Sequence, residues 1–380
     1  MSAIQEELFP PFQKSLDEPL SDKQKKLISI LEVIEIEKYV QSSSYQWMGR
    51  KIKDRCAIAR AFVAKAVYDM PTTRSLIEGL HDRANLRRIC GFGKQAYKTV
   101  YDVVEKDGQL ERVAMKKSTL PSESTFSRAF SEFSESELGD KVHEALVGEY
   151  LSEELVGHIS RDATAIEGNE KAVVKGKEKS IPKKQKRGRP KNGEHREPKE
   201  ERRLSIQVEQ RPAEALKKLP IVCDVGCKTN AKGYKETWKG YKLHIDTADC
   251  GLPVTSVLTS ASLHDSQVAI PMIKLTSAKI IYLYDLMDAA YDSKEINDVS
   301  RLFNHVPIID SNRRRGDAIP MAPAEAVRYN ERSAAERTNG RLKEEFGGRT
   351  VMVKGYKKVK MHLMFGVIAL FGDQLLKLVL

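Results

Sequence analysis

Four residues near the C-terminus, Tyr329, Arg332, Glu336 and Lys343, have types and a spacing that could do chemistry together. Their intervals of three, four and seven positions return to nearly the same face of a helix. A carboxylate can hold a hard cation, and the guanidinium, ammonium and phenol beside it can bind phosphate oxygens. The pattern therefore predicts a helical stripe that could act on a nucleic-acid backbone, although mixed charges are also typical of a solvated helix face.

A helix must carry this stripe, and the flanking residues supply its expected ends. Pro323 suits the first turn of a helix, and Gly347 with Gly348 suits its termination. We therefore expect one helix over about residues 323–346.

Apolar runs upstream predict strands that lie close to carboxylates. Residues 155–166 are typical of a strand, and we expect Asp162 to be exposed near its polar tip. Residues 238–246 and 253–258 predict an antiparallel hairpin, and a helix is expected from Ser266. Further strands are expected at residues 279–284, shortly before Asp288, and at residues 305–309.

The order of these elements predicts the fold class. It is a strand with Asp162, a hairpin, a helix, a strand leading to Asp288, a helix, a strand, and the helix with Glu336. Such an order suits a mixed sheet with helices on its faces, in which acidic groups meet at the carboxyl edge of adjacent strands. We therefore expect an α/β fold with carboxylates gathered at one edge of the sheet.

Four features together resemble insertion-sequence transposases of the DDE type. They are the Tyr-x2-Arg-x3-Glu-x6-Lys spacing, the Gly240-Tyr-Lys-x-His segment, the His264-Asp265 pair and the Asp288-x-x-Tyr-Asp segment. The resemblance extends from about residue 155 to the C-terminus and, more weakly, to the N-terminal helices. It implies a ribonuclease-H-like mixed sheet with flanking helices in residues 151–380, preceded by an all-α DNA-binding domain in residues 1–150.

The resemblance also implies roles for particular residues. The catalytic residues and metal ligands would be the three carboxylates Asp162, Asp288 and Glu336. They would hold two Mg²⁺ ions, for which Mn²⁺ could substitute, and these cations would offset the repulsion among the carboxylates. The residues that would bind DNA phosphates are Tyr329, Arg332 and Lys343.

A protein of this family would cut double-stranded DNA at the ends of its insertion element. It would join these ends to target DNA by metal-dependent phosphoryl transfer, as a homodimer in the DNA complex. Two other functions fit the same residues: a catalytically silent DNA-binding protein derived from a transposase, and a Mg²⁺-dependent nuclease of the same fold. The presence of all three carboxylates and of the whole stripe favours the transposase.

Two assignments stay open. Asp224, at the end of another apolar run, could be the first aspartate in place of Asp162. The order of elements in the family favours Asp162, because it precedes the hairpin with room for a variable insertion. His264 and Asp265 could support the metal ligands or cap the helix that starts at Ser266.

Residues 21–150 predict mostly helices, with a hairpin around Asp107-Gly108. A helix that begins near Pro121 has phenylalanines on one face, and Ser127 and Arg128 fall off that face. It could be the recognition helix of a helix-turn-helix that enters a DNA groove, or an ordinary core helix.

A basic insertion is expected at about residues 169–218. Residues 171–191 contain ten Lys or Arg and a single Glu, without apolar periodicity, so we expect irregular structure. Arg187-Gly-Arg189 resembles the core of an AT-hook, which binds the minor groove of A/T-rich DNA. A generic basic linker that contacts phosphates is the interpretation we favour.

The whole chain of 380 residues carries a net charge of +11, which favours polyanionic partners, nucleic acid before membranes. Its five cysteines lie at irregular positions, as expected of reduced thiols. The apolar residues 363–372 are too few to span a bilayer and predict a buried helix. We therefore expect a cytoplasmic, nucleoid-associated protein.

Overall fold

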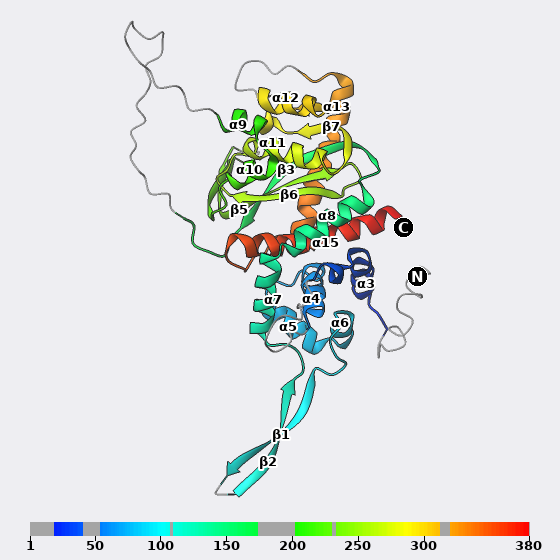
Figure 1. Cartoon of the computed structure of the whole chain (residues 1–380), viewed down its shortest axis with the longest axis vertical. Coiled ribbons are helices and arrows are strands. Elements are labelled where there is room, and N and C mark those ends of the chain that lie inside the picture. The colour runs from blue at the N-terminus through cyan, green and yellow to red at the C-terminus, as the bar shows by residue number, and fades with distance from the viewer. Residues whose placement is uncertain are drawn as a thin grey trace, which may run out of the picture.

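The computed structural model describes residues 19–40, 54–106, 109–173, 202–229, 233–311 and 320–379 (Figure 1). A mixed sheet with helices on both faces occupies one end of the molecule, and a group of helices lies below it in the view of Figure 1. A two-stranded arm extends from these helices away from the sheet. The predicted mixed α/β architecture is confirmed.

The sheet has the strand order β4-β5-β3-β7-β8, and β6 also pairs with β5. Strand β3 is antiparallel to β5 and parallel to β7, which is parallel to β8. Both β4 and β6 are antiparallel to β5. This is the ribonuclease-H-like arrangement that the resemblance implied. The strands are β3 (Leu155–Glu167), β4 (Asp224–Thr229), β5 (Lys235–Ala248), β6 (Pro253–Ser260), β7 (Ile281–Met287) and β8 (Val306–Ile309).

Gly240 allows β5 to serve two groups of partners. Residues 235–240 of β5 pair with β4, and from Tyr241 onward β5 pairs with β6. The φ of 151° at Gly240 and the 2.1 Å that would separate an added Cβ from the Ile166 carbonyl oxygen leave no room for a side chain.

Two groups of helices cover the sheet. Helix α11 contacts β5 and β6, and it packs with α9, α10 and α12. On the opposite face α14 lies against β3 and β5, and α15 lies against β6. The helices are α9 (Arg203–Glu209), α10 (Pro212–Lys217), α11 (Ser266–Ser277), α12 (Lys294–Leu302), α14 (Ser333–Glu345) and α15 (Tyr356–Val379).

The N-terminal part is helical, with one β-hairpin. Phe62 of α4 packs against the three phenylalanines on the apolar face of α7, with ring centroids 4.8–6.5 Å apart. The elements are α3 (Asp22–Ile34), η1 (Ile36–Tyr39), α4 (Arg55–Val67), α5 (Thr73–Asp82), α6 (Ala84–Ile89), β1 (Tyr97–Lys106), β2 (Gln109–Ser118), α7 (Glu123–Glu135) and α8 (Leu138–Tyr150).

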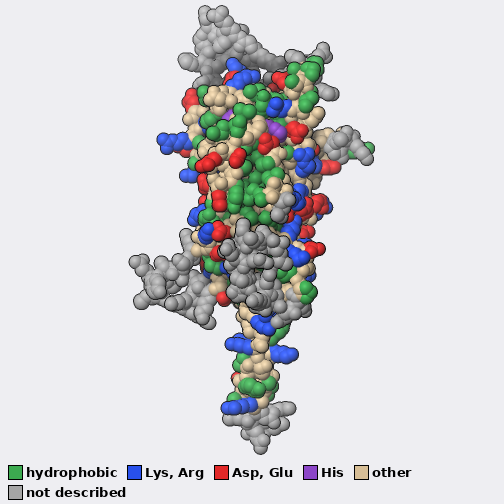
Figure 2. All heavy atoms as spheres, turned by 90° about the vertical axis from the view of Figure 1, so that its right-hand side faces the viewer, with side chains coloured by type: hydrophobic (Ala, Val, Ile, Leu, Met, Phe, Trp, Pro, Cys, Tyr) green, Lys and Arg blue, Asp and Glu red, His purple; other side chains and the backbone are tan. Residues whose placement is uncertain are grey.

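The hairpin predicted around Asp107-Gly108 is present as the β1–β2 arm, in register from Tyr97 opposite Ser118 to Lys106 opposite Gln109. Its described side chains are largely exposed on both faces, and Figure 2 shows Lys and Arg side chains along it.

Helix α15 joins the two parts of the molecule. It packs against α3, α4, α7 and α8 as well as the sheet, so the predicted domains 1–150 and 151–380 share one hydrophobic core. Its 24 residues exceed the expected apolar run at 363–372, and by length and composition alone it could cross a membrane. Two thirds of its most apolar window is buried inside the protein, which is the setting of a core helix.

The predicted irregular insertion at 169–218 is wrong at its C-terminal end, whereas residues 169–173 have no helix or strand, as expected. Residues 203–209 and 212–217 form α9 and α10, because Leu204 and Ala215 are buried, Leu204 within the α11–α12 cluster. At the other end Val173 donates its amide to the Cys223 carbonyl oxygen. Residues 174–201, which include Arg187 and Arg189, lie outside the described part of the chain.

Candidate functional site

The sequence predicted that Asp162 lies near the exposed tip of a strand. In the structure it lies within β3 instead. Strand β3 continues to Glu167, and the Asp162 carboxylate is half-buried. Because successive side chains of a strand alternate between faces, Asp162 points to the α14 side, where Asn339 donates a hydrogen bond of 3.0 Å to its carboxylate. The neighbouring Arg161 is fully buried on the α11 side.

Strand pairing brings Asp288 beside Asp162. Ser160 of β3 is in register with Leu286 of β7, so positions 162 and 288 are the next equivalent pair along these parallel strands. Asp288 directly follows β7, where its carboxylate caps the short helix η2 (Ala289–Tyr291) by accepting from the amide of Ala290 at 2.9 Å.

The carboxyl ends of β6, β3 and β7 meet at one edge of the sheet, because these strands run in the same direction. His264 and Asp265, which follow β6, both act on the pKa of Asp288 and so lie near it. Asp265 forms an ion pair of 2.8 Å with Lys242, and the His264 ring is 2.9 Å from the Ser266 hydroxyl. Asp265 stands at the N-cap position of α11 without making a side-chain cap hydrogen bond.

The two aspartates are electrostatically unfavourable as a charged pair. Burial and the charge of Asp288 raise the pKa of Asp162 to about 6. Burial, and then the charge of Asp265, also raise the pKa of Asp288. Arg332 opposes both shifts. Two crowded oxygen donors with raised pKa values are a setting in which a bound cation is stabilising.

The stripe lies on three consecutive helical segments instead of the one helix that was expected. They are α13 (Pro323–Tyr329), the 3₁₀ turn η4 (Asn330–Arg332) and α14. Arg332 donates to the Glu336 carboxylate at 2.5 Å, and its guanidinium carbon lies over the Tyr329 ring, 5.7 Å from the ring centre. Burial lowers the pKa of Arg332, but Tyr329, Glu336 and Asp162 outweigh it, so the pKa is raised.

Glu336 is turned toward Arg332, and its side chain is 56% exposed. Within the described residues no three His, Cys, Asp or Glu side chains are grouped closely enough to hold a metal ion. The donors nevertheless fit Mg²⁺, because Asp162 and Asp288 supply hard carboxylate oxygens at one edge. Arg332, which holds Glu336, acts on the pKa of both aspartates and so lies near them.

Tyr329 and Lys343, the remaining members of the stripe, also lie near the carboxylates. Burial raises the pKa of Tyr329, and Asp288 acts in the same direction. Burial lowers the pKa of Lys343, and nearby Lys228 and Arg349 lower it further, whereas Glu167 and Asp162 oppose this. The stripe therefore faces β3 and the end of β7.

Asn339 is a member of the stripe that the sequence reasoning missed. It lies three positions after Glu336 and four before Lys343, so the helical spacing could have identified it. It is buried, its amide nitrogen donates to Asp162, and its amide oxygen has no hydrogen-bond partner among the described residues.

Asp224 has a different environment. It is buried at the start of β4, and its carboxylate accepts hydrogen bonds from the amide and the hydroxyl of Ser262. It lies opposite Gly240 on β5, whereas Asp162 lies opposite Ile245. Its carboxylate therefore holds the loop that precedes α11.

A buried ion network supports the edge from behind. Arg161 makes a bidentate pair with Asp246 at 2.7 Å and lies 3.6 Å from Asp285, and all three side chains are fully buried. The two carboxylates raise the pKa of Arg161 despite its burial. The network ties β3 to β5 and β7 directly beneath Asp162.

The proposed DNA-binding residue Arg128 is exposed on α7, as both sequence interpretations of this helix require. Its guanidinium donates to the Ser124 carbonyl oxygen of its own helix, at 3.3 Å.

Two family models, both described as transposase domains, match parts of the chain. Residues 222–371 match a family model described as a transposase DDE domain, and residues 14–102 match one described as a transposase domain. The first match includes Asp288 and Glu336 and begins after Asp162. No curated protein and no solved structure matches the chain.

Proposed function

Because this chain belongs to the insertion-sequence transposases of the DDE type, we propose that it cuts DNA at the ends of its element and joins them to target DNA. In this proposal Asp162, Asp288 and Glu336 are the catalytic carboxylates. The partner is double-stranded DNA, which a homodimer engages on the nucleoid in the cytoplasm.

The observation that carries the proposal is the meeting of Asp162 and Asp288 at one edge of the sheet, with the Arg332–Glu336 pair facing them from η4 and α14. The three carboxylates come from elements far apart in sequence. They would hold two Mg²⁺ ions, or Mn²⁺ in their place. When bound, such ions supply activation of the attacking hydroxyl and stabilisation of the leaving oxygen in an in-line displacement.

The stripe residues bind and orient the DNA in this proposal. Arg332 presents a planar fork that can hold two phosphate oxygens, and Lys343 presents a point charge about two turns beyond Glu336. The Tyr329 ring, which lies under the Arg332 guanidinium, can contact the terminal nucleotide. Asn339 donates to Asp162 and so orients that carboxylate. Positioning and charge stabilisation are the main contributions that a protein makes to phosphoryl transfer.

The test incubates the protein with Mg²⁺ and a duplex that ends in the terminal repeats flanking its gene. We expect cleaved ends and products joined to a second duplex. Asp288→Ala and Asp162→Ala should remove both products while DNA binding persists. Asp224→Asn is the matched control and should keep both.

Other outcomes discriminate among the candidate functions. Cleavage without joining would favour a nuclease of the same fold, and binding without cleavage would favour a silent DNA-binding protein. Activity that is lost in Asp224→Asn but kept in Asp162→Ala would refute the assignment of the first aspartate.

A further inference from the structure

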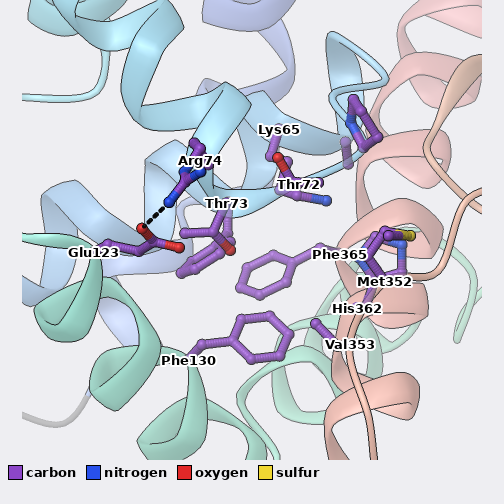
Figure 3. Close-up of a pocket in the computed structure, with 13 residues that line it drawn as sticks. Lys65, Thr72, Thr73, Arg74, Glu123, Phe130, Met352, Val353, His362 and Phe365 are labelled. Carbon is purple, nitrogen blue, oxygen red and sulfur yellow. Dashed lines mark ion pairs between the residues drawn. The ribbon is translucent and has the colours of Figure 1, made fainter. Parts of the chain in front are cut away.

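A pocket of about 370 Å³ lies away from the carboxylates, where α4, α5 and α7 meet α15 and the segment before it. Figure 3 shows Lys65, Thr72, Thr73 and Arg74 on one side of this pocket, across from Phe130 and Val353. One wall is therefore polar, with the Lys65 ammonium and the Arg74–Glu123 ion pair, and the other is apolar. This volume is large enough for a small ligand group.

Lys65 is the unusual residue of this pocket. Its side chain is 94% buried, since only 6% of the residue is exposed, and it lines the pocket. Among the described residues its ammonium makes no hydrogen bond and no ion pair, and the charge of Asp69 stabilises it without such a contact. Burial lowers the pKa of Lys65 to about 8, so the group is still mostly charged at pH 7. A buried charge without a partner is costly, and an anion in the pocket would supply the partner.

The N-terminus of α5 opens on the same pocket. Thr72 caps this ten-residue helix by accepting from the Ser75 amide, which leaves the amides of Thr73 and Arg74 without an intrahelical acceptor. Amides of a first helical turn and the helix dipole favour an anion. Thr73 adds a hydroxyl to this wall.

The remaining polar residues of the pocket do not satisfy Lys65. Arg74 is paired with Glu123 at 3.7 Å, and both side chains are mostly exposed. His362 is buried at the other wall, where its ring nitrogen hydrogen-bonds the Gly347 carbonyl oxygen at 2.9 Å. Burial lowers the pKa of His362 to about 3, so it is neutral at pH 7.

We propose that this pocket binds a phosphate group, held by the Lys65 ammonium and by the first turn of α5 at Thr73 and Arg74. The phosphate belongs to the backbone of the DNA that the protein binds. Only this choice of source rests on the proposed function, because the anion site is defined by the pocket itself.

The chain that leads from the stripe to the pocket supports DNA as the source. Lys343 lies near the end of α14, and Arg349 acts on the pKa of both Lys343 and Asp69, so it lies near the stripe and near the end of α4. A Cβ added at Gly347 would be 3.9 Å from the Cα of Ala66, next to Lys65 in α4. A DNA backbone held at Lys343 can therefore continue along Arg349 toward the pocket.

The experiment measures DNA affinity as a function of salt, in the Asp288→Ala background so that no cleavage occurs. The probe is a duplex that ends in the terminal repeat. We expect Lys65→Met to lower the affinity about tenfold and to reduce the slope of log K against log salt by about 0.9, the value for one phosphate contact. Lys23→Met is the matched control, since exposed Lys23 also acts on Asp69 but does not line the pocket. It should change neither quantity to this extent.

Thr73→Pro is a second variant that does not touch Lys65. Proline is favoured at the first position of a helix, and Thr72 already has the extended backbone that precedes proline, so the fold should persist. The change removes one amide hydrogen and one hydroxyl from the pocket, and we expect it to weaken DNA binding as well.

Thermal stability measured with inorganic phosphate and no DNA distinguishes two sources of the bound phosphate, the DNA backbone and the free anion. Reduced DNA binding by Lys65→Met and Thr73→Pro supports the DNA backbone. A second outcome is that inorganic phosphate stabilises the parent but not Lys65→Met, while the variants bind DNA as tightly as the parent does. This outcome supports the anion site and overturns DNA as the source of the phosphate. If neither variant differs from Lys23→Met in either measurement, the pocket binds no phosphate. Failure of the parent to bind any DNA refutes the proposed function, and the phosphate measurement still tests the pocket.

Discussion

Replacement of Asp162 by asparagine should stabilise the metal-free protein, and this prediction tests the electrostatics of the site without any catalytic assay. The substitution keeps the shape of the side chain and an oxygen that can accept the 3.0 Å hydrogen bond from Asn339. It removes a half-buried negative charge that lies beside Asp288. A residue that is important only for folding would behave in the opposite way.

The size of the expected stabilisation follows from the raised pKa of Asp162. Burial and Asp288 raise the pKa of Asp162 from 3.8 to about 6, a shift of roughly two units, and each unit corresponds to about 1.36 kcal/mol. Between these two pH values the folded state holds a proton that the unfolded state has lost, so the free energy of unfolding falls as pH rises. Above pH 6 the whole cost, about 3 kcal/mol, is present; below pH 4 it is absent.

The assay is equilibrium unfolding of the parent and Asp162→Asn in EDTA, at pH 8 and at pH 4.5. The variant should be more stable by about 3 kcal/mol at pH 8, and most of this difference should disappear at pH 4.5. Added Mg²⁺ should then stabilise the parent more than the variant, because the ion binds the folded parent. Asp224→Asn is the control and should be destabilised, since its carboxylate holds Ser262.

A variant that is no more stable than the parent at pH 8 would refute the reasoning. So would a stability difference that is the same at both pH values, because a titrating carboxyl group cannot produce it.

Three further predictions follow from the same geometry. Arg332→Lys and Lys343→Met should keep metal binding, measured by Mn²⁺ titration, while the cleavage rate falls by about tenfold to a thousandfold because the DNA is less well positioned. An unchanged cleavage rate in both variants would mean that the stripe is only a solvated helix face. Arg161→Met should cost about 3–5 kcal/mol in urea unfolding, because two buried carboxylates lose their cation, and a loss near zero would contradict the buried network. Deletion of residues 175–191 should lower affinity for every duplex and flatten its salt dependence, whereas a loss confined to A/T-rich duplexes would favour the minor-groove interpretation of Arg187 and Arg189.

The sequence by itself predicted five of the six strands of the sheet and their order, and it missed β4. Alternating and β-branched runs predicted strands where β3, β5, β6, β7 and β8 occur, and helical spacing predicted the face of α14 that carries Glu336. These patterns are local, since the periods of two and 3.6 residues are properties of the single strand or helix. Two helices were missed at residues 203–217, because they are short and rich in charge.

The tertiary structure decided which side chains meet. Asp162 and Arg161 are neighbours in sequence, yet the pairing of β3 directs one toward α14 and buries the other against Asp246. The sequence favoured Asp162 and left Asp224 open as an alternative, and strand register places Asp162, rather than Asp224, beside Asp288. The contact of Asn339 with Asp162 and the Lys65 ammonium, which has no ion pair among the described residues, were equally invisible. Contacts of this kind depend on strand register and on the packing of distant helices, which no local pattern in the chain specifies.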